Sequence, residues 1–93
     1  MHIGLLKVEL HFPSPQSLKE KRKITRSLTT KLRASHNISL AEIGYQDKWQ
    51  RCLLAVVCVS NGADLAHAQL EKVLRDVERE RDMVLTDYSL EII

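Results

Sequence analysis

The sequence predicts an α+β fold in which four strands make one antiparallel sheet and two helices cover it, in the order βαββαβ. Segments 2–12, 38–45, 51–60 and 83–93 are rich in alternating or continuous apolar residues, which is typical of strands. Segments 18–35 and 62–79 instead repeat apolar residues at helical spacing. A length of 93 residues, 44% of them hydrophobic and 28% charged, suits one folded domain over 1–93 rather than a disordered chain.

The first strand and the turn after it follow from alternation and from proline. One face of the segment His2–Phe12 is apolar and carries Leu6, Val8, Leu10 and Phe12. Pro13-Ser14-Pro15 then ends the strand, because proline lacks the N–H group that a central strand needs. We therefore expect the chain to leave the sheet at Pro13.

The first helix has a start signal and one apolar stripe. Ser17 and Glu20 have the spacing of a capping box, in which both side chains accept hydrogen bonds from otherwise unpaired N–H groups. The helix is therefore expected to begin at Leu18 and to run to about Ser35. Its stripe, which we expect to pack on the sheet, consists of Leu18, Ile24, Thr25, Leu28 and Leu32.

The middle of the chain predicts a hairpin. Ile38–Tyr45 and Arg51–Ser60 are expected strands, and the polar segment Gln46–Gln50 between them is short enough for a hairpin loop. The second of these strands has apolar residues on both faces, namely Leu53, Leu54, Val56, Val57 and Val59. It is therefore expected at the centre of the sheet.

The last third of the chain predicts the second helix and the fourth strand. Asn61-Gly62 breaks the preceding strand, and Asn61 is the expected helix cap. The helix is expected to run to about Arg79 with an apolar stripe of Ala66, Leu70, Val73, Leu74 and Val77. Met83–Ile93 is the expected final strand, and its alternation puts these residues on one face: Val84, Tyr88, Leu90 and Ile92.

Two halves of this kind usually form the ferredoxin-like sandwich. Right-handed crossovers then put both helices on one face of the sheet, with the first and third strands central. The other face has no helix. Because a contiguous apolar patch on such a face commonly marks an interface, we expect a homodimer. The fold by itself does not indicate a function.

Two motifs and their order resemble the YlxP-like family of small bacterial proteins. The first motif is Ser17-Leu18-Lys19-Glu20-Lys21-Arg22, and the second is the segment Ala41–Arg51; Val59-Ser60-Asn61 adds to the match, which covers nearly the whole chain. The resemblance implies a ferredoxin-like fold and no established activity, so it supplies no catalytic residues. Family genes often lie near those for translation initiation and ribosome maturation factors, which implies an RNA or ribosome setting.

Charge is concentrated on the first helix. The net charge of the chain is +2, but Lys19–Arg33 alone contains seven basic residues and one acid, Glu20. On an ideal helix one face, away from the apolar stripe, carries Lys19, Arg22, Lys23, Arg26 and Arg33. This face is either a nucleic-acid-binding surface for RNA phosphates or only a solvated helix face. The second helix mixes charges of both signs and is expected to be solvated.

Four further residues are candidates for contact with a partner, each with a structural alternative. Lys21 points into the apolar stripe of its own helix, so its ammonium either snorkels past the sheet edge or reaches a ligand or carboxylate. Tyr45, Trp49 and Arg51 flank the polar hairpin and are of residue types enriched at binding hot spots. Alternatively, Trp49 folds back over the sheet edge to cover the core.

Other chemistry is not indicated by the sequence. The four histidines are scattered and no Gly-rich phosphate loop or nucleophile elbow occurs, so we expect no metal, no cofactor, no small-molecule substrate and no enzymatic activity. Cys52 and Cys58 lie too far apart along one strand for a disulfide and are expected to be small core residues. No segment has the length of a membrane span, which favours a cytoplasmic protein.

The predicted function is therefore that of a non-enzymatic binding module. Its basic helix would associate with RNA or the ribosome through phosphates, because the central strands lack the aromatic residues that stack bases in RRM domains. The alternative is a homodimeric protein–protein interaction module that does not bind nucleic acid.

Overall fold

The two longest strands lie at the centre of the sheet in the computed structural model, which describes residues 1–93. They are β1 (His2–His11) and β3 (Arg51–Ser60), and they pair with each other in antiparallel register. β2 (Ser39–Gly44) flanks β3, and β4 (Val84–Ile92) flanks β1, so the order is β2-β3-β1-β4 with antiparallel neighbours throughout. The predicted βαββαβ fold with β1 and β3 central is confirmed.

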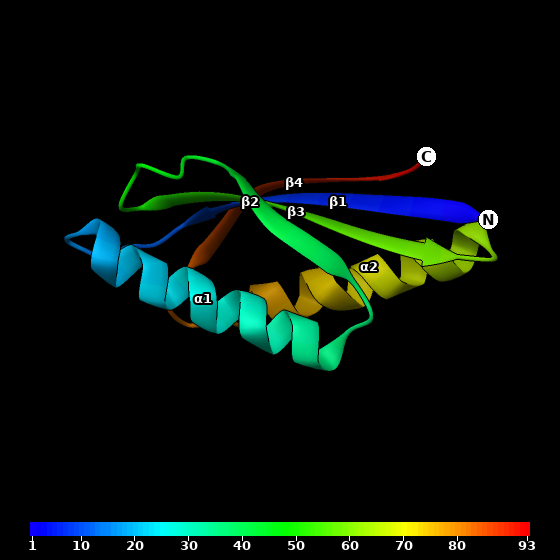
Figure 1. Cartoon of the computed structure of the whole chain (residues 1–93), viewed down its shortest axis with the longest axis horizontal. Helices are drawn as coiled ribbons and strands as arrows, with labels where there is room; N and C mark the ends of the chain where they lie inside the picture. The colour runs from blue at the N-terminus through cyan, green and yellow to red at the C-terminus, as the bar shows by residue number, and fades with distance from the viewer.

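Both helices lie on the same face of the sheet, as Figure 1 shows. They are α1 (Leu18–Ser35) and α2 (Ala63–Glu78). The predicted start of α1 is confirmed: Ser17 Oγ accepts a hydrogen bond from the Glu20 N–H at 3.1 Å. The Glu20 carboxylate in turn accepts one from the Gln16 N–H at 2.8 Å, one residue before the cap.

One hydrophobic core fills the space between the sheet and the helices. β1 and β3 contribute alternate residues to it, and the predicted stripes of α1 and α2 face them; among the largest members are Leu6, Leu10, Phe12, Leu28, Leu54 and Leu70. Cys52 and Cys58 lie on the same side of β3 and are buried in this core. They are therefore core residues, as the sequence predicts.

Two details of the fold differ from the sequence-based expectations. The N-cap of α2 is Gly62 and not Asn61, which is exposed; Gly62 makes no side-chain cap. In β4, the register against β1 shifts between Glu9 and Leu10, so that Leu85 opposes Leu10 on the core face and Val84 opposes His11. Val84 therefore lies on the opposite face of the sheet from Tyr88, which opposes the core residue Val8. A bulge of this kind adds one residue to a strand, so the residues on its two sides follow opposite patterns of inward-facing and outward-facing side chains.

The lengths and hydropathies of α1 and α2 rule out either helix as a membrane span.

Candidate nucleic-acid interface

Four of the cations on α1 have no intramolecular partner. Lys19, Arg22, Lys23 and Arg26 are all exposed, and none makes an ion pair or a side-chain hydrogen bond. A surface hollow of about 260 Å³ is lined by these four residues alone. We call them the α1 ridge. The ridge presents unneutralised positive charge at the surface, which is what a polyanion requires.

The other cations of α1 are engaged within the molecule. Lys31 Nζ lies 3.1 Å from Glu80 Oε1, just beyond α2. Arg33 Nη2 donates a hydrogen bond of 3.2 Å to the backbone carbonyl of Leu40 on the edge strand β2. The helical wheel groups Arg33 with the four ridge residues, but the structure does not. A backbone carbonyl of the edge strand β2 accepts its hydrogen bond, and the helix sequence alone does not reveal this acceptor.

Lys21 is buried and clamps α1 to the end of β2. Its side chain is 1% exposed, and its Nζ lies 2.7 Å from Glu42 Oε2. The same ammonium donates a hydrogen bond of 2.7 Å to the Tyr45 carbonyl. Glu42 Oε2 is buried and has no hydrogen-bond partner, so the ion pair with Lys21 is the contact that compensates its charge. The expected snorkelling of Lys21 past the sheet edge is therefore wrong, and the alternative that its ammonium reaches a carboxylate is confirmed. Because the side chain is buried, Lys21 is not available for contact with an external partner.

The hairpin after β2 begins with an unusual backbone conformation. Tyr45 has a φ of 59°, in the left-handed region that residues other than glycine seldom occupy. Its carbonyl accepts hydrogen bonds from the Lys48 N–H at 3.0 Å and from Lys21 Nζ. At the other end of the loop, the Gln50 carbonyl accepts a hydrogen bond from the Phe12 N–H at 2.9 Å. The hairpin loop is thus held at both ends.

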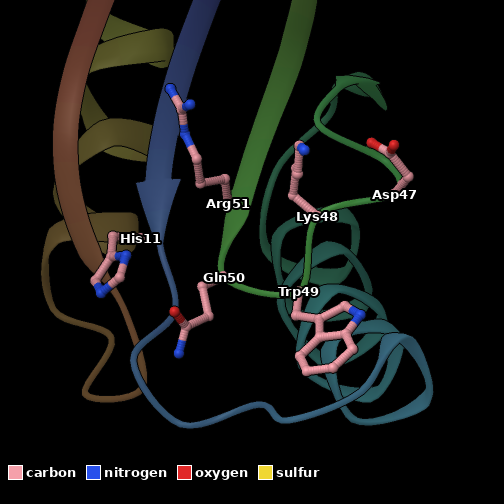
Figure 2. A pocket seen from close by; sticks show the side chains of 6 residues that line it. All are labelled: His11, Asp47, Lys48, Trp49, Gln50 and Arg51. Atoms are coloured by element: carbon pink, nitrogen blue, oxygen red, sulfur yellow. The ribbon is translucent and has the colours of Figure 1, made fainter.

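Trp49 does not cover the core. Its side chain is 51% exposed, and it is not among the residues that pack against the hydrophobic cluster. Figure 2 shows its indole at one side of a hollow of about 470 Å³, whose lining residues are His11, Asp47, Lys48, Trp49, Gln50 and Arg51. The expectation that Trp49 folds back over the sheet edge is therefore wrong, because the anchored loop directs it outward.

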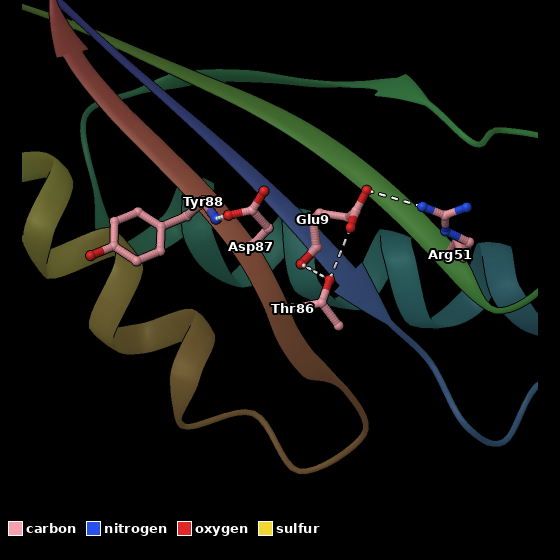
Figure 3. Close-up of polar contacts among 5 residues, drawn as sticks. All are labelled: Glu9, Arg51, Thr86, Asp87 and Tyr88. Carbon is pink, nitrogen blue, oxygen red and sulfur yellow. Dashed lines mark hydrogen bonds and ion pairs between the residues drawn. The ribbon is translucent and has the colours of Figure 1, made fainter.

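Arg51 belongs to a polar network on the helix-free face of the sheet. Its guanidinium stacks on the Tyr45 ring, with 3.7 Å between the guanidinium carbon and the ring centroid, and lies 3.1 Å from Glu9 Oε1. Thr86 Oγ1 lies 3.1 Å from the Glu9 carbonyl oxygen and 3.2 Å from Glu9 Oε2 (Figure 3). The pKa of the Glu9 carboxyl is lowered, first by the Tyr45 side chain and then by Thr86 and Arg51. Glu9 therefore holds the Arg51 side chain in place.

The two cysteines are poor nucleophiles. Burial raises the pKa of the Cys52 thiol to about 12, with the nearby Glu42 carboxylate adding to the shift. Burial also raises the pKa of Cys58, whose Sγ lies 3.7 Å from the Ala66 carbonyl oxygen. Since the thiolate is the reactive form, neither residue is placed for covalent chemistry.

The histidines have separate surroundings. His36 Nε2 lies 2.6 Å from Asp76 Oδ2, and His67 pairs with Glu71 within α2. No three side chains among the His, Cys, Asp and Glu residues converge as a metal would require.

Comparison with known proteins places the chain in a family. The model of a protein family of unknown function, DUF503, matches residues 3–90. The chain belongs to the DUF503 family. It is also 33% identical over 90 residues to the uncharacterized protein YlxP of Bacillus subtilis (strain 168), an alignment that covers 92% of this chain and 98% of YlxP. The predicted resemblance to YlxP-like proteins is thereby confirmed, and neither the DUF503 family nor YlxP has an assigned activity.

Three residues that position this site were missed by sequence reasoning. Glu42 shares the parity of the buried Leu40, so a carboxylate facing the helices could have been found from strand alternation. Glu9 and Thr86 gave no signal, because they are 77 positions apart and meet only through the pairing of β1 with β4.

Proposed function

We propose that this DUF503 protein is a non-enzymatic cytoplasmic module that binds RNA, in the setting of the ribosome, through phosphate contacts of the α1 ridge. The observation that carries the proposal is the absence of any intramolecular acid partner for the four ridge cations. Neighbouring cations of the ridge are three or four positions apart, a spacing at which like charges destabilise a helix by about 0.2–0.5 kcal/mol per pair. Lys19 also lies in the first turn, where the helix dipole disfavours positive charge.

Helix stability therefore does not account for the ridge, whereas recognition of a polyanion does. On α2 the exposed cations Lys72 and Arg75 alternate with acids, so the two helices differ in this respect. If about four phosphates of single-stranded RNA are neutralised, counterion release gives a slope of log affinity against log salt of about −2.8.

Charge reversal tests the proposal. Arg22→Glu/Arg26→Glu should abolish association with RNA or ribosomes in a filter-binding or sedimentation assay, with unchanged circular dichroism. Lys72→Glu/Arg75→Glu is the matched control, because it makes the same change in net charge on exposed sites of α2. An equal loss of RNA binding in both variants would show that only the net charge of the protein matters. Unchanged binding in the α1 variant would contradict the role of the ridge.

A second candidate function is that of a homodimeric interaction module, favoured by the helix-free face of the sheet. Val59 is 63% exposed, and Ile3, Leu5 and Val57, at neighbouring positions of β1 and β3, are only partly buried. The same face also carries two charged residues, Lys7 on β1 and Asp87 on β4. Apolar area together with charges of both signs suits an isologous contact with a second copy.

Light scattering tests this second function. A dimer should weigh twice the chain mass of 10.7 kDa, and Val59→Glu should convert it to a monomer. Ala68→Glu, at an exposed site on α2, is the control that should leave the dimer intact. A monomer across micromolar to millimolar concentrations would contradict the proposal.

A further inference from the structure

The exposure of Trp49 is maintained by contacts and is not a property of a loose loop. The loop that carries it starts at Tyr45, whose carbonyl is fixed by the buried Lys21 ammonium. At the other end of the loop, Gln50 Nε2 donates a hydrogen bond of 3.0 Å to the Pro13 carbonyl, in the turn after β1. A half-exposed indole on a loop anchored in this way forms a preorganised flat surface, which lowers the entropy lost on binding.

The groups around the indole differ in the interactions that they can still make. Arg51 is occupied by Glu9 and by the Tyr45 ring, so one face of that ring is covered. The Lys48 side chain has no partner in the molecule. In Figure 2, Lys48 and the Trp49 indole come from adjacent positions of the loop and extend in opposite directions from it. The hollow thus offers one aromatic face, one available cation and polar groups, in a volume of about 470 Å³.

We infer that this hollow binds a nucleobase of single-stranded RNA, stacked on the Trp49 indole, with an adjoining phosphate at Lys48. The inference rests on the proposed function, because it takes RNA as the partner of the α1 ridge. Stacking on an aromatic side chain combined with cations along the backbone is the usual mode of single-strand recognition. The 2.7 Å contact of Lys21 with Tyr45 places the first turns of α1 next to this hairpin. The ridge and the hollow therefore belong to neighbouring elements of the fold.

Two probes separate the base from the phosphate: an oligoadenylate, and an abasic phosphodiester oligomer of the same length. Trp49 is the single tryptophan of the chain, so tryptophan fluorescence reports on this site alone. We expect saturable quenching by the oligoadenylate and none by the abasic oligomer. Trp49→Ala should weaken oligoadenylate binding about tenfold without changing abasic binding, and Trp49→Phe should retain most of the affinity.

The matched control is Tyr88→Ala, which removes another half-exposed aromatic residue from β4, outside the hollow. It should leave both affinities unchanged. Equal binding of the two probes without quenching, and no effect of Trp49→Ala, would overturn the inference while the α1 ridge could still bind phosphates. Loss of oligoadenylate binding in Trp49→Ala but not in Arg22→Glu/Arg26→Glu would support the inference and contradict the proposed function. Trp49 emission that responds to protein concentration and to neither probe would overturn the inference and assign the hollow to contact between copies.

Discussion

Lys21 and Lys23 lie two positions apart on α1, and their ammonium groups have opposite surroundings. Lys21 is 1% exposed and contacts both the Glu42 carboxylate and the Tyr45 carbonyl, whereas Lys23 lies on the ridge without any partner. The inward cation holds the hairpin in place, and the outward cations leave their charge available. The same residue type on one helix is therefore paired or left exposed according to what the rest of the fold brings to it.

The largest effect should come from breaking the inward contact. Lys21→Met leaves the Glu42 carboxylate and the Tyr45 carbonyl without their cation, and losing one partner of a buried ion pair costs about 3 kcal/mol. Urea denaturation should show this loss in the free energy of unfolding. Lys23→Met is the control, expected within about 0.5 kcal/mol of the parent.

A double variant identifies the source of that loss. Lys21→Met/Glu42→Gln should recover part of the stability, because it removes the unpaired charge that the single variant leaves behind. Coincident unfolding curves for Lys21→Met and Lys23→Met would show that burial makes no difference between the two lysines.

The outward cations should instead change the salt dependence of RNA binding. Lys19→Gln/Lys23→Gln removes two of the proposed phosphate contacts, so the slope should fall from about −2.8 to about −1.4. The measurement is a titration of fluorescent single-stranded RNA at several salt concentrations, with Lys31→Gln as the control, because Lys31 is paired with Glu80. An unaltered slope in the double variant would remove Lys19 and Lys23 from the interface.

Arg33 should behave as a paired cation, although the helical wheel groups it with the ridge. Arg33→Ala removes the hydrogen bond to the Leu40 carbonyl and should lower the free energy of unfolding by about 1 kcal/mol. The salt slope of RNA binding should not change. Arg26→Ala should show the reverse pattern, with lower affinity and little change in stability.

Arg51 is half-exposed but paired with Glu9, and this ion pair predicts that the stability of the fold depends on pH. The folded state lowers the pKa of Glu9 below its ordinary value of 4.5. The contribution of the ionised carboxylate to stability is therefore complete above that value and is lost as the pH falls through the lowered pKa. Denaturation between pH 6 and pH 3 should show a smaller acid-side loss in Glu9→Gln than in the parent, and equal losses would contradict the assignment.

The smallest effect should be a gain in stability on the ridge. Arg22→Glu replaces a like-charge pair with Arg26 by an attractive pair four positions apart, which is worth about 0.3–0.5 kcal/mol. The gain should disappear at about 1 M salt, where surface charges are screened. Lower stability of Arg22→Glu at low salt would mean that Arg22 has a structural partner.

The sequence by itself determined the order of the elements and the surface that carries the charge. Alternation in His2–Phe12, apolar residues on both faces of β3 and the stripes of the helices depend only on neighbours within each element. The bulge in β4 could not be predicted from these patterns, because it depends on how β4 pairs with β1.

Only the tertiary structure decided what each cation of α1 does. Helical spacing gives the direction of a side chain relative to its own axis, but not the group from another segment that meets it. Lys21 meets Glu42 and Tyr45, and Arg33 meets Leu40, because the crossover places α1 beside the edge strand β2. Lys19, Arg22, Lys23 and Arg26 face away from that strand, and for this reason their charge remains at the surface.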